Sequence, residues 1–465
     1  MLVCAGAWGT AYLPDGWSWE FAGLTLPVRP QTVPSFVCFL LVVTGLLLWA
    51  AVWVALGAGL RAGTSVAGLL RSAALWSAPL LLAPPLASRD AWSYAAIGHM
   101  TWSGVNPYLH GPAALPGPFA DAVDPMWAHT ASPYGPLFVQ LAALVVGGTG
   151  LSVVLSALAL RLLAVAGLLL IGLALPRLAR HFGGSPPRAV WLVLLNPLVL
   201  LHLVAGQHNE ALMMGLAVAG LVVALEGAPG LGAVLASLAT GVKLPAVVVV
   251  AAVGLVWAAQ LSGRLARLRG LVMAGVICLL TLAALGELTE LGWGWLGALQ
   301  VPGEVRNLLS VPTALGIALG AVLALFGAGD HTDGLIRALR ITGGLVALGV
   351  GTYQLLLAGR RDRVLHATGV TLLCVAILAP ADHPWYLLWG GVVLAATALS
   401  QSWIRAFVIG SLALCAYTVC DMSFVALGRS GQVVVITLVV SGAIGAWVAA
   451  NRSTRPVPMV ARTDP

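Results

Sequence analysis

The sequence predicts an all-α protein with many membrane-spanning helices. Three observations favour that class: the composition, the length of the apolar runs and the placement of charge. Of the 465 residues, 60% are hydrophobic and 8% are charged, with a mean hydropathy of +0.98. Soluble domains carry roughly 25% charged residues, so most of this surface must face lipid. No polar stretch is long enough for a soluble domain, and we expect residues 1–465 to form one integral-membrane domain.

Basic and acidic residues occupy alternate sets of loops. Arginines cluster in short loops at 177–188, 264–269, 360–363 and 452–462, whereas acidic residues fall almost wholly in the other loops. Cytoplasmic loops carry the excess of Lys and Arg in membrane proteins. The formal net charge of +7 therefore indicates topology and not a surface for nucleic acid.

The apolar runs predict the spans in order along the chain. About 20 residues are needed to cross a bilayer, and we expect about fourteen membrane elements with both termini cytoplasmic. The expected segments are 1–13, 35–59, 65–86, 151–175, 188–204, 209–226, 231–243, 245–258, 268–289, 335–358, 365–380, 384–400, 404–421 and 431–450. Pro245 breaks the helix between two of these segments, which predicts a broken helical hairpin at Lys243-Leu244-Pro245.

Three outer segments are too long to be turns: 87–134, 132–148 and the second large outer segment 290–334, which contains 309–327. In the first, Ser88 can cap a helix, and apolar residues then recur at helical spacing up to Asn106-Pro107-Tyr108, which we expect to stop it. We predict that this helix lies in the interface without crossing. Residues 132–148, which include Tyr134, and residues 309–327 are expected to be re-entrant or surface helices.

Asp90 is the first candidate for chemistry, because it stands where the chain enters the first outer segment. Arg89 and Tyr94 are its helical neighbours. A carboxylate there can take a proton from a sugar hydroxyl as a general base. The alternative is an acid at a helix start, stabilised by the helix dipole.

A second group of polar residues surrounds an outer turn between two apolar runs. His208, Asn209 and Glu210 follow one another there. Polar groups packed against a membrane are costly and tend to mark sites, although an ordinary polar turn is the alternative. The HxxE type of metal spacing is absent and the six cysteines show no CxxC spacing, so neither a metal site nor a disulfide framework is indicated.

Lys243 is the only lysine in the chain, and it lies at the helix break within apolar sequence. Buried cations in membranes are usually paired with an anion, such as the phosphate of a lipid carrier, and a snorkelling lysine is the alternative. Arg306 in the second outer segment could clamp a phosphate or neutralise Glu304. His383, Trp385 and Tyr386 begin another span, where interfacial aromatic residues can also stack on sugars.

Several blocks of the sequence resemble one known family. SRDAWSYAAIGHMTWSGVNPY, SPYGPLF, NPLVLLHLVAGQHNEALMMGL, LGWGWLGAL and HPWYLLWG are similar, in this order over about residues 60–400, to the actinobacterial polyprenol-phosphate-mannose-dependent α-1,6-mannopyranosyltransferases of lipomannan and lipoarabinomannan biosynthesis. That family has the multispanning GT-C fold and an acidic residue in the first large outer loop, and Asp90 matches it. Ala91 and Trp92 depart mildly from the usual block, and Glu210 stands where an aspartate is usual.

The resemblance implies an inverting glycosyltransferase of the cell membrane, with its site on the extracytoplasmic face. Mannose would pass from polyprenol-phosphate mannose to a mannan or glycolipid acceptor, with Asp90 as base and no cofactor or metal. The residues that would contact donor or acceptor are Arg89, Tyr94, Asn106, Tyr108, Tyr134, His208, Asn209, Glu210, Lys243, Arg306, His383, Trp385 and Tyr386. Three alternatives remain open: a transferase for another lipid-linked sugar, a secondary transporter with broken helices, and a non-catalytic lipid-binding or scaffold protein.

Overall fold

The structure is a computed structural model, and it is almost entirely helical, which confirms the all-α class. It describes residues 1–11, 18–21, 24–27, 35–61, 63–358 and 363–453. The end of the first expected span, and most of the expected basic loops at 360–363 and 452–462, lie outside the described residues.

The first part of the chain contains short elements around one long helix. Its elements are α1 (Leu2–Thr10), β1 (Ser18–Phe21), β2 (Leu24–Pro27), α2 (Ser35–Ala58), α3 (Val66–Ser77) and the 3-10 helix η1 (Ala78–Leu82). Strands β1 and β2 pair antiparallel, with Ser18 opposite Pro27. This hairpin was not predicted, because the prediction relied on long apolar runs. Helix α1 has 9 residues and is too short to cross a bilayer.

The long segment that follows is folded against the helices. It contains α4 (Asp90–Trp102), η2 (Pro112–Ala114), α5 (Pro118–Asp121) and η3 (Pro125–Trp127), and α6 (Pro136–Gly148) comes next. The N-cap of α4 is Arg89, so Ser88 does not cap the helix as expected; its Oγ instead accepts a hydrogen bond from the backbone N–H of Asp90 at 3.0 Å in the turn just before the helix. The helix ends at Trp102, before the predicted stop at Asn106, and Gly104 then adopts a φ of 77°.

Helix α4 is buried against other helices of the protein, and the expectation that it lies in the membrane interface stays a prediction. Most of its residues are buried, including Trp92 and Tyr94 at 1% exposure each. It crosses α6 closely, since a Cβ added at Gly98 would lie 2.6 Å from the carbonyl oxygen of Ala142. Apolar spacing alone does not separate a helix against lipid from a helix against protein.

The middle of the chain contains the longest run of packed helices. Its elements are α7 (Val153–Ala159), α8 (Arg161–His181), α9 (Pro186–Leu194), α10 (Pro197–Val199), the π-helix η4 (Leu200–Ala205), α11 (Glu210–Leu225), α12 (Pro229–Val242), η5 (Leu244–Ala246), α13 (Val247–Ala258) and α14 (Ala266–Leu288). The break at Lys243 is confirmed. The expected span 188–204 is instead bent by 45° after Asn196, whose side chain caps α10.

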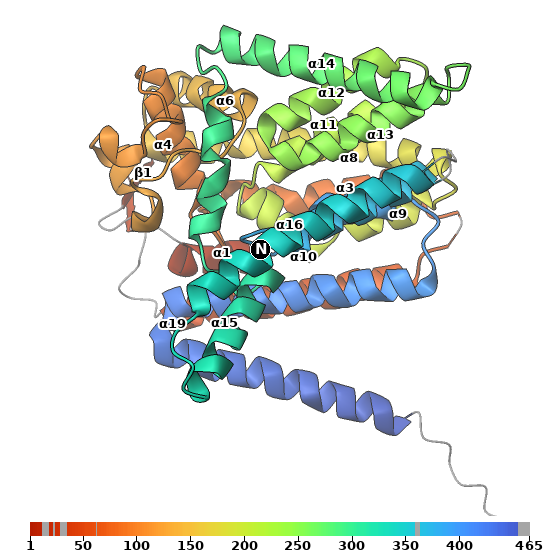
Figure 1. Cartoon of the computed structure of the whole chain (residues 1–465). Helices are drawn as coiled ribbons and strands as arrows, with labels where there is room; N and C mark the ends of the chain where they lie inside the picture. The colour runs from red at the N-terminus through yellow and green to blue at the C-terminus, as the bar shows by residue number, and fades with distance from the viewer. Residues whose placement is uncertain (12–17, 22–23, 28–34, 62, 359–362, 454–465) are drawn as a thin grey trace, which may run out of the picture.

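The last part of the chain contains η6 (Gly294–Glu304), α15 (Val311–Leu325), α16 (Thr332–Leu357), α17 (Val364–Ile377), α18 (Leu387–Ala395) and α19 (Gln401–Ser453). The two spans expected after 400 are joined in α19, with a kink at Gly428, where φ is 70°. Figure 1 shows α14 along the upper edge of the molecule and α19 along the lower edge, with α8, α11, α12 and α13 between them. Helix α4 and strand β1 gather at the left end of this view.

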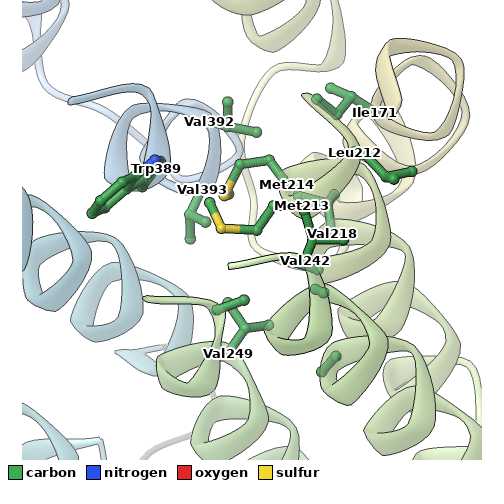
Figure 2. Packing of buried hydrophobic residues seen from close by; sticks show 14 of the residues in the cluster. Ile171, Leu212, Met213, Met214, Val218, Val242, Val249, Trp389, Val392 and Val393 are labelled. Carbon is green, nitrogen blue, oxygen red and sulfur yellow. The ribbon is translucent and has the colours of Figure 1, made fainter. Parts of the chain in front are cut away.

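The number of long apolar helices fits a polytopic membrane protein. By length and composition, 6 of the described helices can cross a membrane, or 7 if the bent pair counts as one span. Seven further apolar helices have 10–17 residues; five of them match expected membrane elements, and α6 and α15 match the segments expected to be re-entrant or surface helices. The expected elements 1–13 and 384–400 correspond to α1 and α18, which have 9 residues each. The core lies where α11, α12, α13 and α18 meet. Figure 2 shows Met213 and Met214 of α11 between Val392 and Val393 of α18 and Val249 of α13.

Candidate functional site

A cavity of about 340 Å³ lies between α4, the break after α12, η6 and the start of α18. Its polar lining combines Asp90, Ser93, Lys243, His383 and Tyr386. Its apolar lining includes Ile97, Leu244, Leu299, Val301, Val305 and Val375. One chamber therefore offers a carboxylate, a cation, aromatic rings and an apolar wall.

Asp90 is held through one of its two carboxylate oxygens. Tyr94, one turn further along α4, donates its hydroxyl to Oδ2 at 3.2 Å, and Nδ1 of His208 lies 3.2 Å from the same atom. The side chain of Asp90 keeps 27% of its surface exposed. Burial raises its pKa, but the hydrogen bond and charge of His208 and the charge of Lys243 outweigh burial, so the pKa lies well below its usual value. Asp90 is ionised at neutral pH.

Lys243 is held at the end of α12 by a carboxylate and three rings. Its Nζ donates to Oε1 of Glu210 at 2.5 Å and to the hydroxyl of Tyr386 at 3.3 Å. The same nitrogen lies 4.4 Å from the ring centre of Tyr386, 5.6 Å from that of Tyr134 and 5.7 Å from that of Trp389. These rings supply cation–π attraction. The side chain keeps 14% of its surface exposed, so the cation can be reached from the cavity.

A close backbone contact fixes the wall that carries Tyr134 and Lys243. The N–H of Gly135 donates to the carbonyl oxygen of Val242 at 3.1 Å. A Cβ at position 135 would lie 2.2 Å from the carbonyl oxygen of Gly241, so only glycine allows this approach. The start of α6 and the end of α12 are thereby joined next to both side chains.

The turn before α11 lies behind the cavity. Gln207, His208, Asn209 and Glu210 are all buried, at 0–2% exposure. His208 stacks on Trp385 with ring centres 3.6 Å apart, and Trp385 stacks on His383 at 4.5 Å. Burial lowers the pKa of His383 to about 4, so this ring is neutral at neutral pH.

The structure brings together some of the sequence-predicted residues and separates others. Asp90, Tyr134, Lys243, His383 and Tyr386 line the cavity. Tyr94, His208, Glu210 and Trp385 contact these residues from behind. The Tyr108 hydroxyl donates to the backbone carbonyl oxygen of Tyr134, and Oδ1 of Asn106 accepts from the backbone N–H of Tyr108. Both residues therefore stabilise the loop between α4 and α6.

Arg89, Asn209 and Arg306 are not among the lining residues. Arg89 pairs with Asp124 at 3.5 Å. Asn209 is buried at 2% exposure within the turn. Arg306 pairs with Asp333 on the surface, not with Glu304 and not at the cavity. The reading of these residues as substrate contacts stays a prediction.

Sequence reasoning missed several lining residues. Ser93 is three residues after Asp90 on the same helix, so helical spacing would have found it. Nothing in the sequence around Trp127, or around the apolar lining residues of η6 and α17, predicts that they line the cavity. Only the fold brings these residues to it. Within the part of the chain that the structure describes, no three His, Cys, Asp or Glu side chains are grouped as metal ligands, and the expectation about metals stays a prediction.

Comparisons with known proteins give matches over most of the chain. Residues 1–259 match the family profile described as "Alpha-(1->6)-mannopyranosyltransferase, N-terminal domain", and residues 312–452 match "MptB C-terminal domain". The alpha-(1->6)-mannopyranosyltransferase A of Mycobacterium tuberculosis is 37% identical over 79% of this chain and 73% of its own length. A probable alpha-(1->6)-mannopyranosyltransferase of Mycolicibacterium smegmatis is 36% identical over 81% and 73%. The alpha-(1->6)-mannopyranosyltransferase B of Corynebacterium glutamicum is 32% identical over 72% and 60%.

Proposed function

The chain belongs to the alpha-(1->6)-mannopyranosyltransferase family, and from that premise we propose that it moves mannose from polyprenol-phosphate mannose to the 6-hydroxyl of a mannan or glycolipid acceptor. One observation carries the proposal. A single cavity is lined by the ionised carboxylate of Asp90, by the cation of Lys243 with its surrounding aromatic rings, and by apolar side chains. These are the groups that a hydroxyl, a phosphate and a prenyl chain require.

Asp90 acts as the general base in this scheme. The acceptor oxygen attacks the anomeric carbon, the bond from that carbon to the phosphate oxygen breaks, and the phosphate leaves with the electron pair. The hydroxyl proton goes to Oδ1 of Asp90, because Oδ2 already accepts from two partners. The low pKa of Asp90 suits a late transfer, since the hydroxyl becomes strongly acidic as its new bond forms. Attack opposite the leaving group inverts the anomeric centre.

Lys243 and the apolar wall receive the lipid-linked donor. The ammonium group offsets the charge on the phosphate, and Tyr134, Tyr386 and Trp389 keep it directed at the cavity. The prenyl units next to the phosphate lie along the wall that includes Leu299 and Val375. His383 and Tyr386 border the sugar, with Trp385 stacked behind His383. No nucleotide site is required, because the donor is carried by lipid.

The direct test uses the purified protein in lipid nanodiscs. Radiolabelled polyprenol-phosphate mannose and a short α-1,6-mannoside should give a product one mannose longer, and digestion with a linkage-specific mannosidase should release the label. Polyprenol-phosphate arabinose and glucose serve as competing donors. Transfer from either of these in place of mannose would overturn the donor, and the absence of all transfer would favour the transporter or scaffold readings.

The site faces the outside of the cell membrane in this proposal. The alternation of charge between loops supports that orientation. Asp121 is exposed in the same segment as Asp90, and Arg264 is exposed in a basic loop. In a background without the native cysteines, D121C should react with an impermeant thiol reagent on intact cells, and R264C only after permeabilisation. The reverse pattern would place the site in the cytoplasm.

A further inference from the structure

The turn before α11 contains an unusual density of buried polar groups. Gln207 adopts a positive φ of 60°, and it and the next three residues are 0–2% exposed. Within the described residues, both amide atoms of Gln207 and Asn209, Nε2 of His208 and Oε2 of Glu210 are buried without a hydrogen-bond partner. Such groups are costly to bury and call for an explanation. The turn contacts both reactive groups of the proposed mechanism.

We infer that this turn, residues 207–210, sets the geometry of the reaction, with His208 positioning Asp90 and Glu210 positioning Lys243. The inference rests on the proposed function. His208 lies 3.2 Å from the base, and Glu210 lies 2.5 Å from the cation, so one turn reaches both groups. Neither His208 nor Glu210 lines the cavity, which makes them positioning residues and not catalytic ones.

His208 is well suited to orient a carboxylate. An ionised carboxylate only accepts hydrogen bonds, so Nδ1 of His208 carries the proton that it shares with Asp90. Stacking on Trp385 at 3.6 Å keeps the imidazole from turning away. His208 and Tyr94 both act on Oδ2, and the other oxygen is thereby presented for proton transfer. The charged or titratable groups that interact with Asp90 are Tyr94, Tyr134, His202, His208, Lys243, His383 and Tyr386.

Glu210 is the counter-ion of Lys243. It is fully buried at the first position of α11, where the helix dipole favours an anion. Because its charge balances that of Lys243, a phosphate meets a cation that is fixed in place but partly neutralised. The pair therefore limits how tightly the anionic donor and the anionic product bind. Without the carboxylate, the cation would hold a phosphate more strongly and release the product more slowly.

The two roles make separable predictions for two residues of the same turn. H208Q puts an amide at the place of Nε2 and removes the donor near Asp90. Its kcat should fall roughly 10–100-fold, and the KM for polyprenol-phosphate mannose should be unchanged. In the pH profile of kcat, the fall of activity on the acidic side should move to higher pH, because Asp90 loses a hydrogen-bond donor. H208N keeps a donor near the position of Nδ1 and should recover part of kcat.

Glu210→Gln should change the binding of the donor and product phosphates. It should leave the acidic side of the pH profile of kcat unchanged. The KM for the donor and the Ki for polyprenyl phosphate should fall about tenfold together, and kcat should fall as product release slows. E210D keeps the charge and should return both constants toward the native values. H110Q and E226Q are matched controls, because both residues are exposed and Glu226 lies at the far end of α11.

Transfer by the unchanged protein is measured first, so a failure of the proposed function is recognised separately. Thermal unfolding identifies a variant that does not fold, and H208N and E210D then carry the test. Two results would overturn the inference. One is that H208Q and E210Q change kcat, KM, Ki and the acidic side of the pH profile in the same way, as a merely structural turn would. The other is that the Ki for polyprenyl phosphate is unchanged in E210Q.

Discussion

Replacing Asp90 by asparagine changes a single atom of the carboxylate, and the structure determines which way the new amide turns. Tyr94 and His208 both donate to Oδ2 of Asp90. The amide of the Asp90→Asn variant therefore places its carbonyl oxygen toward these donors and its NH₂ toward the cavity. In the proposed mechanism, a group that accepts a proton is thereby replaced by a group that only donates hydrogen bonds, at the point where the acceptor hydroxyl must lose its proton.

The expected loss follows from the role of the base. General-base catalysis contributes about 10²–10⁴-fold, which corresponds to about 2.7–5.4 kcal/mol in the barrier at about 1.36 kcal/mol for each factor of ten. Donor binding should change little, because Lys243 and its rings are unaltered. We therefore expect kcat of Asp90→Asn to fall by this factor and the KM for the donor to stay within about twofold.

Single-turnover transfer in nanodiscs measures this loss without product release. Asp121→Asn is the matched control, since Asp121 is an exposed aspartate of the same segment, and it should transfer as the native protein does. Robust transfer by Asp90→Asn, within about tenfold of native, would remove Asp90 from the proton transfer. A large loss in Asp121→Asn as well would show that the assay reports the fold of the segment.

Three further predictions concern the cation, the packing and the response to pH. Lys243→Ala should raise the KM for the donor at least about tenfold and Lys243→Arg should recover part of it, because the charge is kept; an unchanged KM in Lys243→Ala would return this residue to a snorkelling role. Gly98→Ala should lower stability by about 1–3 kcal/mol in thermal unfolding, since its Cβ would lie 2.6 Å from the carbonyl oxygen of Ala142, whereas Gly275→Ala, with nothing within 4 Å, should not; equal melting temperatures would contradict the close crossing. Burial raises the pKa of Asp382 from its ordinary value of 3.8 to about 7. The stability that its protonated form contributes is therefore fully present below about pH 4 and is lost as pH rises through 7. Asp382→Asn should remove this part of the dependence of melting temperature on pH, and the same pH dependence in the variant and the native protein would refute the prediction.

The sequence predicted the parts of the site that depend on neighbours along the chain. Asp90 and Tyr94 are one helical turn apart, and Pro245 marks the break beside Lys243. Both observations are local, and both are present in the structure. The family resemblance, based on ordered blocks, was confirmed by the comparisons.

The sequence did not predict the contacts that join distant segments. Glu210 and Lys243 are 33 residues apart, and His208 and Asp90 are 118 apart, so only the fold brings each pair together. The sequence also did not show which apolar helices are buried in the protein and which face lipid. In a chain that is 60% hydrophobic, α4 has the same apolar character as helices that face lipid, although it is enclosed by protein. The sequence shows the charge of Arg306 but not its partner, which is Asp333 in the structure.

The π-helix η4 accommodates one residue more than an α-helical turn and leaves the phase of the following turn almost unchanged. Its hydrogen bonds close wider rings than those of an α-helix, so the chain reaches Gln207 with one residue more than an α-helical path would hold. Each residue of an α-helix turns the chain by about 100°, and each residue of the wider π-helix turns it by less. Removing one residue between Leu200 and Ala205 would therefore let this segment relax to an α-helix while His208 still points toward Asp90. The site consequently tolerates a one-residue deletion within η4 better than it would within a regular α-helix, where the same change rotates everything that follows.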